Sequence, residues 1–145
     1  MTEINPPEGY RHHTPVMIRY GDMDTLGHVN NAKYLTYIEQ SRLGYFGDLV
    51  RWDGSRSGVG LILAKATVEY KAPLTAADEM VDVWTRTSRI GTKSFDMEHL
   101  VIRAKDGLVA AEGYTVMAAY NYAESATVAL PDEWRQRITA YEPAL

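Results

Sequence analysis

The chain has 145 residues and contains no cysteine. This absence excludes disulfide bonds, thiolate nucleophiles and cysteine-based zinc sites. Long apolar runs are missing too, because no segment reaches the roughly 18 apolar residues of a membrane-spanning helix. The first residues, MTEINPPEGYRHHTP, also lack the apolar core of a secretory signal. We therefore expect a cytoplasmic protein that does not enter a membrane and does not depend on an oxidising compartment.

The chain has few positively charged residues: it contains 15 Lys and Arg residues but 19 Asp and Glu residues, and its net charge is −4. The basic residues are scattered, so nothing indicates a nucleic-acid-binding surface. Hydrophobic residues make up 46% of the chain, which is enough for a sizeable core. Length and composition together predict a single domain over residues 15–145, preceded by a loose, proline-rich arm over residues 1–14.

A helical pattern occupies residues 30–49. Asn30 suits the N-cap, because an Asn side chain accepts hydrogen bonds from the free N–H groups of a first turn. Arg42 interrupts the apolar arc of this helix three residues after Glu39, and we expect the two to form an ion pair at the edge of the core. The alternative is that Arg42 extends past the core to water. The arc itself consists of Tyr34, Leu35, Ile38, Tyr45, Phe46 and Leu49.

Most of the rest of the chain shows the period-two alternation of half-buried strands. After a turn-rich link at residues 51–58, this pattern and a β-rich segment near the N-terminus predict five strands, at 15–20, 64–72, 80–89, 94–104 and 108–120. Asp106-Gly107 predicts a tight hairpin, and a short helix is expected after Leu130. Short connections make sequential strands antiparallel. We therefore predict an α+β fold, in which a five-stranded antiparallel sheet curls around one long central helix.

Residues 20–34, YGDMDTLGHVNNAKY, concentrate polar side chains directly before the predicted helix. Asp22, Asp24 and His28 match no strong metal-ligand spacing, so we expect no metal. The free N–H groups and the positive dipole end at a helix start can stabilise an oxyanion. A carboxylate beside such a site suits acyl transfer. The alternative is that these residues only form turns and cap the helix.

The run YGDMDTLGHVNNAKYLTYIEQSR resembles the signature of hotdog-fold thioesterases of the 4-hydroxybenzoyl-CoA thioesterase type, and its HVNN variant also resembles acyl-acyl carrier protein thioesterases. The segments VEYKAPLTAADEMVDVWT and KSFDMEHLVIR resemble later strands of the same family. The resemblance covers about residues 15–120. It implies the hotdog fold, hydrolysis of an acyl-CoA, and no cofactor besides the coenzyme A of the substrate. It also implies active sites at the subunit interface of a homodimer or homotetramer.

The resemblance assigns roles to individual residues. Asp24 matches the catalytic carboxylate, which acts as a nucleophile or as a base toward water, and the Asn31 N–H matches the oxyanion donor. His28 and Asn30 are expected to position these groups, whereas Asp22 is expected to hold the loop backbone. Substrate contacts are expected at Gly27, Tyr34, Thr67, Arg89 and Lys93, the last two near the coenzyme A phosphates.

Other functions stay open at this point. One alternative is the same hydrolysis on an acyl carrier protein, although the acidic net charge gives no long-range attraction to an acidic carrier. Another is a non-catalytic protein that only binds acyl-thioesters. A hotdog dehydratase is disfavoured, because its Asp and His are five residues apart, whereas His28 follows Asp24 by four. Glu39 and Glu69 are the reserve candidates for the catalytic carboxylate.

Overall fold

A computed structural model describes residues 5–52 and 58–145. In chain order its elements are β1 (His12–Met17), α1 (Asn31–Leu49), β2 (Val59–Tyr70), β3 (Met80–Ile90), β4 (Ser94–Arg103), β5 (Val109–Asn121), β6 (Ala126–Thr127) and α2 (Asp132–Tyr141). Short 3₁₀ helices lie at Tyr20–Asp22 and Ala76–Asp78. Most of the link predicted at 51–58 and the start of the predicted arm lie outside the described residues. Within the described ranges, no helix has both the length and the apolar character needed to cross a membrane.

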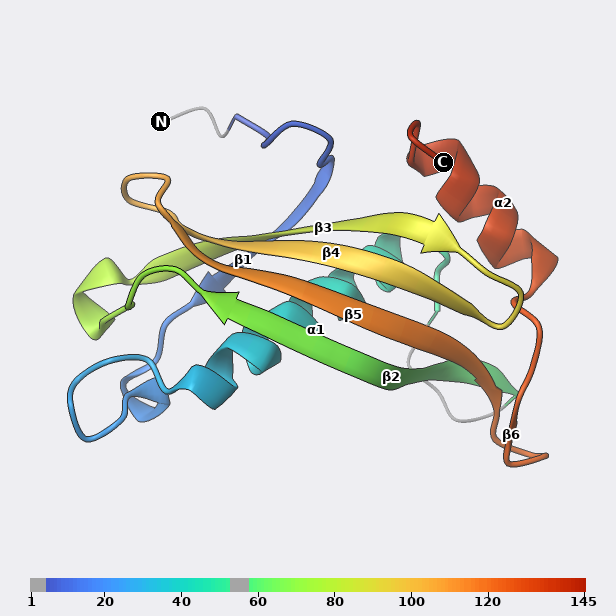
Figure 1. The fold of residues 1–145 in the computed structure, drawn as a ribbon, viewed down its shortest axis with the longest axis horizontal. Helices are drawn as coiled ribbons and strands as arrows, with labels where there is room; N and C mark the ends of the chain where they lie inside the picture. The colour runs from blue at the N-terminus through green and yellow to red at the C-terminus, as the bar shows by residue number, and fades with distance from the viewer. Residues whose placement is uncertain (1–4, 53–57) are drawn as a thin grey trace.

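All the strands belong to one antiparallel sheet in the order β1-β3-β4-β5-β2, with β6 added beside β5 (Figure 1). This confirms the predicted antiparallel α+β fold, but the sheet has six strands and not five. The prediction missed β6 because two residues are too few to show alternation. The first strand was misplaced as well: β1 runs from His12 to Met17, so residues 12–14 belong to the sheet and not to the arm.

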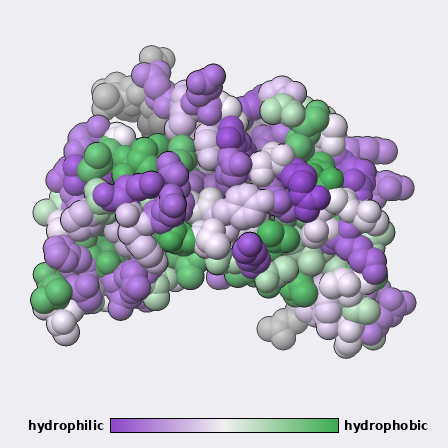
Figure 2. Space-filling model, in the orientation of Figure 1, coloured by the Kyte–Doolittle hydropathy of each residue, from purple (hydrophilic) through white to green (hydrophobic). Residues whose placement is uncertain are grey.

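β2 begins at Val59, before the predicted start at residue 64. The run Val59 to Ala64 is almost continuously apolar, and alternation cannot detect such a segment. A bulge between Leu63 and Lys65 then shifts its register with β5. Within the described chain β2 pairs only with β5, so its other edge is open. Figure 2 shows a hollow beside this edge, between the loop of residues 20–30 and the turn at β6.

α1 packs against one face of the curled sheet (Figure 1). Near its start, Tyr37 and Ile38 join an apolar cluster with side chains of β1, β3, β4 and β5. Near its end, Phe46 joins a second cluster with β4, β5 and α2. Leu35 was predicted on the core side, but it is 38% exposed, because it lies on the same helix face as the exposed Asn31, one turn further on, and not on the face that packs against the sheet.

A buried polar chain lies between these two clusters. Ser41 of α1 contacts the hydroxyl of Thr85 at 2.6 Å, and Thr85 contacts Nδ1 of His99 at 2.9 Å. Nε2 of His99 lies 2.8 Å from the hydroxyl of Thr115. Burial, assisted by the charge of Arg42, lowers the pKa of His99 to about 3, so the ring is neutral at pH 7.

Arg42 does not form the predicted ion pair. The residue is only 7% exposed, but its guanidinium nitrogens are not among the fully buried polar atoms that lack a partner, so only the tip of the side chain reaches water. Among the ion pairs of the described residues, none joins Arg42 to Glu39, which stays at the surface while Arg42 turns inward. Burial lowers the pKa of Arg42, and the charge of Glu39 opposes this effect only from a distance.

Candidate active site

The loop that carries Asp24 is a short closed turn held by its own backbone. Met23 and Val29 form an isolated antiparallel bridge. Inside it, the Asp24 N–H donates to the His28 carbonyl at 2.7 Å, and the Gly27 N–H donates to the Asp24 carbonyl at 3.2 Å. Gly27 has a φ of +81°, a left-handed conformation that a side chain would strain. The predicted substrate contact at Gly27 therefore coincides with a backbone requirement of this turn.

The Asp24 carboxylate is fixed at one oxygen. Its Oδ1 accepts hydrogen bonds from the Leu26 N–H at 2.9 Å and the His28 N–H at 3.0 Å. The residue is exposed, and among the described residues nothing donates to Oδ2. The loop therefore orients the carboxylate through Oδ1 and leaves Oδ2 open for a reacting group.

Asp22 holds the loop against α1, as the sequence predicted. This buried side chain accepts from the Arg19 N–H at 2.9 Å and from the Tyr37 hydroxyl at 2.7 Å. The Asp22 carbonyl accepts from the Asn30 N–H at 2.8 Å. Burial first, and then the hydrogen bond to Asp22, raise the pKa of Tyr37 well above its ordinary value, so its hydroxyl stays a donor. Tyr37 thus connects the loop to the helix one and a half turns past its start.

The start of α1 presents an unbonded N–H group. The Asn30 side chain caps the helix, as predicted, by accepting from the Ala32 N–H at 2.9 Å. The Asn30 carbonyl accepts from the Lys33 N–H at 2.8 Å. In the described parts of the chain, no acceptor bonds to the Asn31 N–H. This donor, at the positive end of a 19-residue helix, is available to a ligand.

A pocket of about 290 Å³ lies between this helix start and the end of β2. The Tyr70 hydroxyl donates to the Asn31 carbonyl at 2.8 Å, and the rings of Tyr70 and Tyr34 meet edge to face with centroids 5.0 Å apart. The Tyr34 hydroxyl points to the Ala72 carbonyl at 3.5 Å, and burial raises the pKa of Tyr34. The lining residues are His28, Val29, Asn31, Tyr34, Tyr70, Lys71, Ala72 and Pro73.

The fold thus brings together most of the residues predicted for the site, namely Asp24, Gly27, His28, Asn30, Asn31 and Tyr34. Sequence reasoning missed Tyr70 and Lys71. Alternation placed Tyr70 correctly on the inward face of its strand, but no local signal reports that this face ends at the start of α1. The contact joins residues 39 positions apart.

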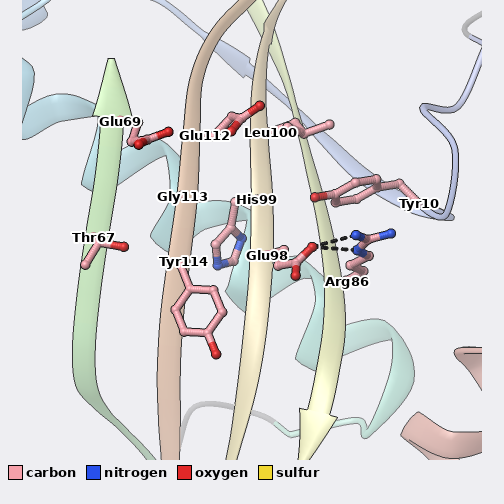
Figure 3. A pocket seen from close by; sticks show the side chains of 10 residues that line it. All are labelled: Tyr10, Thr67, Glu69, Arg86, Glu98, His99, Leu100, Glu112, Gly113 and Tyr114. Atoms are coloured by element: carbon pink, nitrogen blue, oxygen red, sulfur yellow. Dashed lines mark hydrogen bonds and ion pairs between the residues drawn. The ribbon is translucent and has the colours of Figure 1, made fainter. Parts of the chain in front are cut away.

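Thr67 and Glu69 lie elsewhere. They belong to a separate pocket of about 630 Å³ on the sheet face that points away from α1 (Figure 3). In that pocket, Arg86 donates to Glu98 at 2.6 Å and 3.0 Å, and the Arg86 guanidinium lies 4.4 Å from the centre of the Tyr10 ring. Neighbouring residues of a strand face opposite sides, so Tyr70 faces the helix while Thr67 and Glu69 face outward.

Arg89 and Lys93 lie at the β3–β4 hairpin, at the opposite end of the sheet from the Asp24 loop (Figure 1). Arg89 makes a two-point ion pair with Asp96, with both N···O distances 3.1 Å, and this pairing raises the pKa of Arg89. Lys93 is exposed. Within one chain, neither residue joins the cluster around Asp24.

The curled antiparallel sheet with its packed helix agrees with comparisons to known proteins. The family model of the thioesterase-like superfamily matches residues 18–138. The chain belongs to this family. Its fold is the hotdog fold of thioesterases.

Individual relatives support this assignment. A thioesterase from Thermus thermophilus, whose structure was solved in complex with coenzyme A and Zn, is 35% identical, with a TM-score of 0.82 over 94% of this chain and 98% of that chain. The long-chain acyl-CoA thioesterase FadM of Escherichia coli is 20% identical over 86% of this chain and 95% of its own length. The chloroplastic acyl-acyl carrier protein thioesterase ATL3 of Arabidopsis thaliana is 25% identical over 77% of this chain and 60% of its own length.

Proposed function

We propose that this protein is an acyl-CoA thioesterase, which uses water to convert an acyl-CoA into a free acid and coenzyme A. One observation carries the proposal: an exposed carboxylate with a free oxygen, Asp24, shares a short loop with the unbonded first N–H of α1, at Asn31. A thioester carbonyl bound in the adjoining pocket would place its oxygen at this N–H and its carbon toward Asp24. Family membership and the coenzyme A bound to the Thermus thermophilus relative support the same reaction.

The reaction needs charge stabilisation at two points. When Asp24 acts as a base, Oδ2 takes a proton from water, and the water oxygen adds to the carbonyl carbon. The negative charge that develops on the carbonyl oxygen is stabilised by the Asn31 N–H and the helix dipole. Collapse of this intermediate breaks the C–S bond, and the leaving thiolate takes the proton from Asp24. When Asp24 is instead the nucleophile, its oxygen bonds to the carbonyl carbon, the C–S bond breaks and the coenzyme A thiolate leaves; water then hydrolyses the resulting mixed anhydride to the free acid and the Asp24 carboxylate, and the released proton neutralises the thiolate.

One route through a mixed anhydride leaves an isotope pattern that the base role of Asp24 cannot leave. A single turnover in ¹⁸O-labelled water labels only the product acid if Asp24 is a base. It labels the Asp24 side chain if water attacks the aspartyl carbon of a mixed anhydride. Mass spectrometry of the peptide containing Asp24 reads the second outcome directly.

We also propose that two copies pair along their open β2 edges. Three large apolar side chains are exposed on this side, Leu43 at 51%, Leu63 at 46% and Tyr70 at 49%, and unpaired strand edges tend to associate. An antiparallel pairing about a two-fold axis would carry the β3–β4 hairpin of the partner subunit toward the Asp24 end of this chain. Arg89 and Lys93 would then be able to contact coenzyme A across the interface, although they are remote within one chain.

The variant Asp24→Asn tests the proposed catalytic group. Asn keeps an oxygen that can accept from the Leu26 and His28 N–H groups, so the loop should keep its shape while the base is lost. With acyl-CoA substrates we expect kcat to fall about 100-fold or more. Asp132→Asn makes the same chemical change at an exposed residue of α2 and serves as the control. Wild-type activity in a folded Asp24→Asn variant would refute the role of Asp24, and Glu39 and Glu69 would be tested next.

The similarity to ATL3 supports a second candidate, hydrolysis of the same thioester on an acyl carrier protein. The two substrates share the chemistry at Asp24 and differ in the surface that binds the carrier. A parallel assay with matched acyl-CoA and acyl-carrier-protein substrates separates them. A much higher kcat/KM on the carrier protein would favour this second candidate.

A further inference from the structure

A second pocket lies between α1 and β2, beyond the proposed active site. Its volume is about 220 Å³, and most of its wall is apolar. Leu43 and Phe46 come from α1, and Leu61 and Leu63 come from β2. The described residues that line it are Glu39, Arg42, Leu43, Phe46, Trp52, Leu61, Leu63 and Met117.

Two hydrogen-bond donors in this wall lack an acceptor. Arg42 is 7% exposed, and within the described ranges of the chain none of the hydrogen bonds or ion pairs involves its guanidinium group. The Nε1–H of Trp52 is also buried without an acceptor. The guanidinium nitrogens of Arg42 are not among the fully buried atoms, so their N–H groups open on the pocket. The rest of this residue is buried, and a charge with little access to water and no paired counter-charge is costly. The wall therefore has donors that no described acceptor bonds, because the Glu39 carboxylate in the same wall does not reach Arg42.

The pocket and the proposed active site lie along the same side of α1. One face of α1 carries Asn31, Leu35 and Arg42. Leu35 follows Asn31 by four residues and Arg42 follows Leu35 by seven, which are about one and two helical turns. β2 runs back along this side: Tyr70 contacts Asn31 at one end, and Leu61 lies in the Phe46 cluster at the other. Between the ends, Leu35 presents an exposed apolar surface. From Asn31 to Arg42 the helix rises about 16 Å.

We propose that this pocket binds the far end of the acyl group and that Arg42, together with Trp52, binds a carboxylate there. The proposal rests on the thioesterase function above and names its substrate class, an acyl-CoA with a second, terminal carboxylate. Helical side chains lean toward the helix N-terminus, so the Arg42 head lies nearer to Asn31 than its backbone does. At about 1.2 Å per bond, as in an extended backbone, an acyl chain of roughly ten bonds reaches about 12 Å, and the Arg42 side chain covers the rest of the rise of about 16 Å.

A carboxylate suits the two donors better than a neutral oxygen. It supplies the negative charge that Arg42 lacks, and its two oxygens match the fork of a guanidinium group. Glu39, the one acidic residue among the described residues of the wall, is exposed to water, which screens its repulsion of a bound anion. The apolar walls then enclose the methylene chain between the two ends.

The test compares three thioesters of equal chain length: dodecanoyl-CoA, twelve-carbon hydroxyacyl-CoA with a terminal hydroxyl, and the mono-CoA thioester of dodecanedioic acid. We expect the wild-type kcat/KM to be at least about tenfold higher for the dicarboxylic thioester than for dodecanoyl-CoA. In Arg42→Met, which keeps the length of the side chain but removes its donors, this ratio should fall at least about tenfold. Trp52→Phe should lower it by a smaller factor, because it removes one neutral donor.

Two further variants serve as controls. Arg137→Met removes a guanidinium from α2, where Arg137 pairs with Glu133 at 2.7 Å, and it should keep the wild-type ratio. Arg42→Lys keeps the charge and should keep part of the preference. If Arg42→Met does not fold, the Arg42→Lys and Trp52→Phe ratios still decide the question, because both must lie below the wild-type ratio.

The outcomes separate the two proposals. Hydrolysis of dodecanoyl-CoA without preference for the dicarboxylic thioester overturns the carboxylate site and leaves the thioesterase function standing. A preference for the hydroxyl-ended thioester also overturns it, as does an Arg42→Met variant that loses self-association while its substrate ratio is unchanged. In that last case the acceptor for Arg42 comes from a second copy. Failure to hydrolyse any acyl-CoA overturns the proposed function and this inference with it.

Discussion

Asn31→Pro isolates the proposed oxyanion donor, because proline removes one backbone N–H and little else at this position. Asn31 is the first residue of α1, where proline is well tolerated, since the missing N–H has no partner within the helix. Asn30 has a φ of −57° and a ψ of 135°, an extended conformation that is compatible with a following proline. The cap from Asn30 to the Ala32 N–H does not involve the removed group.

The expected loss follows from the role of that single donor. Removing one preorganised oxyanion donor typically costs about 100- to 1000-fold in kcat, or about 3–4 kcal/mol of transition-state stabilisation. We expect Asn31→Pro to lose kcat to this extent and to unfold at nearly the wild-type temperature. Asn31→Ala is the matched control, because it removes the side chain but keeps the N–H, and it should retain activity within a few-fold.

The assay is thiol release from an acyl-CoA at saturating substrate, combined with a thermal melt followed by circular dichroism. A folded Asn31→Pro variant as active as Asn31→Ala would show that the Asn31 N–H does not stabilise the transition state. Equal large losses in both variants would show that the side chain matters instead, and this result would also refute the reasoning.

Three further predictions concern the supports of the site and the core. Tyr37→Phe removes the 2.7 Å hydrogen bond to Asp22. The free energy of unfolding, measured by urea denaturation, should fall by about 1–2 kcal/mol, and kcat should fall by about tenfold. An unchanged kcat would show that Tyr37 does not position the loop. Glu79 has a φ of +66°, so Glu79→Gly should relieve backbone strain of about 1 kcal/mol. Calorimetry should then show a Tm that is higher by about 2–4 °C. A lower Tm would show that Glu79 is not strained. His99 has a pKa of about 3 in the folded protein and of about 6.5 in the unfolded chain. The unfolded chain therefore binds a proton more readily. The contribution of His99 to stability is present above pH 6.5 and is lost as the pH falls toward 3. Between pH 6 and 4, wild-type stability should therefore fall by up to about 1.4 kcal/mol per pH unit more than that of His99→Gln, and parallel pH profiles would rule out His99 as the cause.

Local patterns predicted much of this fold correctly. The N-cap at Asn30 and the hairpin at Asp106-Gly107, where Gly107 has a φ of +76°, both depend on chemistry within a few residues. The alternating segments of β3, β4 and β5 were also found to within about one residue, because each buries one face and exposes the other. β6 and the first half of β2 were missed, since one is too short and the other too uniformly apolar to alternate.

The candidate site also has one part that local sequence predicts and another part that only tertiary packing creates. By itself, the sequence determined the loop of Asp24, the capped start of α1 and their adjacency, because these groups are neighbours along the chain and interact through local hydrogen bonds. Only the tertiary structure decided that Tyr70 closes the pocket, that Thr67 faces away from it, and that Arg42 turns inward without Glu39. Those outcomes depend on how β2 returns along α1 and on which side chains the packed sheet leaves uncovered. Such long-range packing has no counterpart in any short window of sequence.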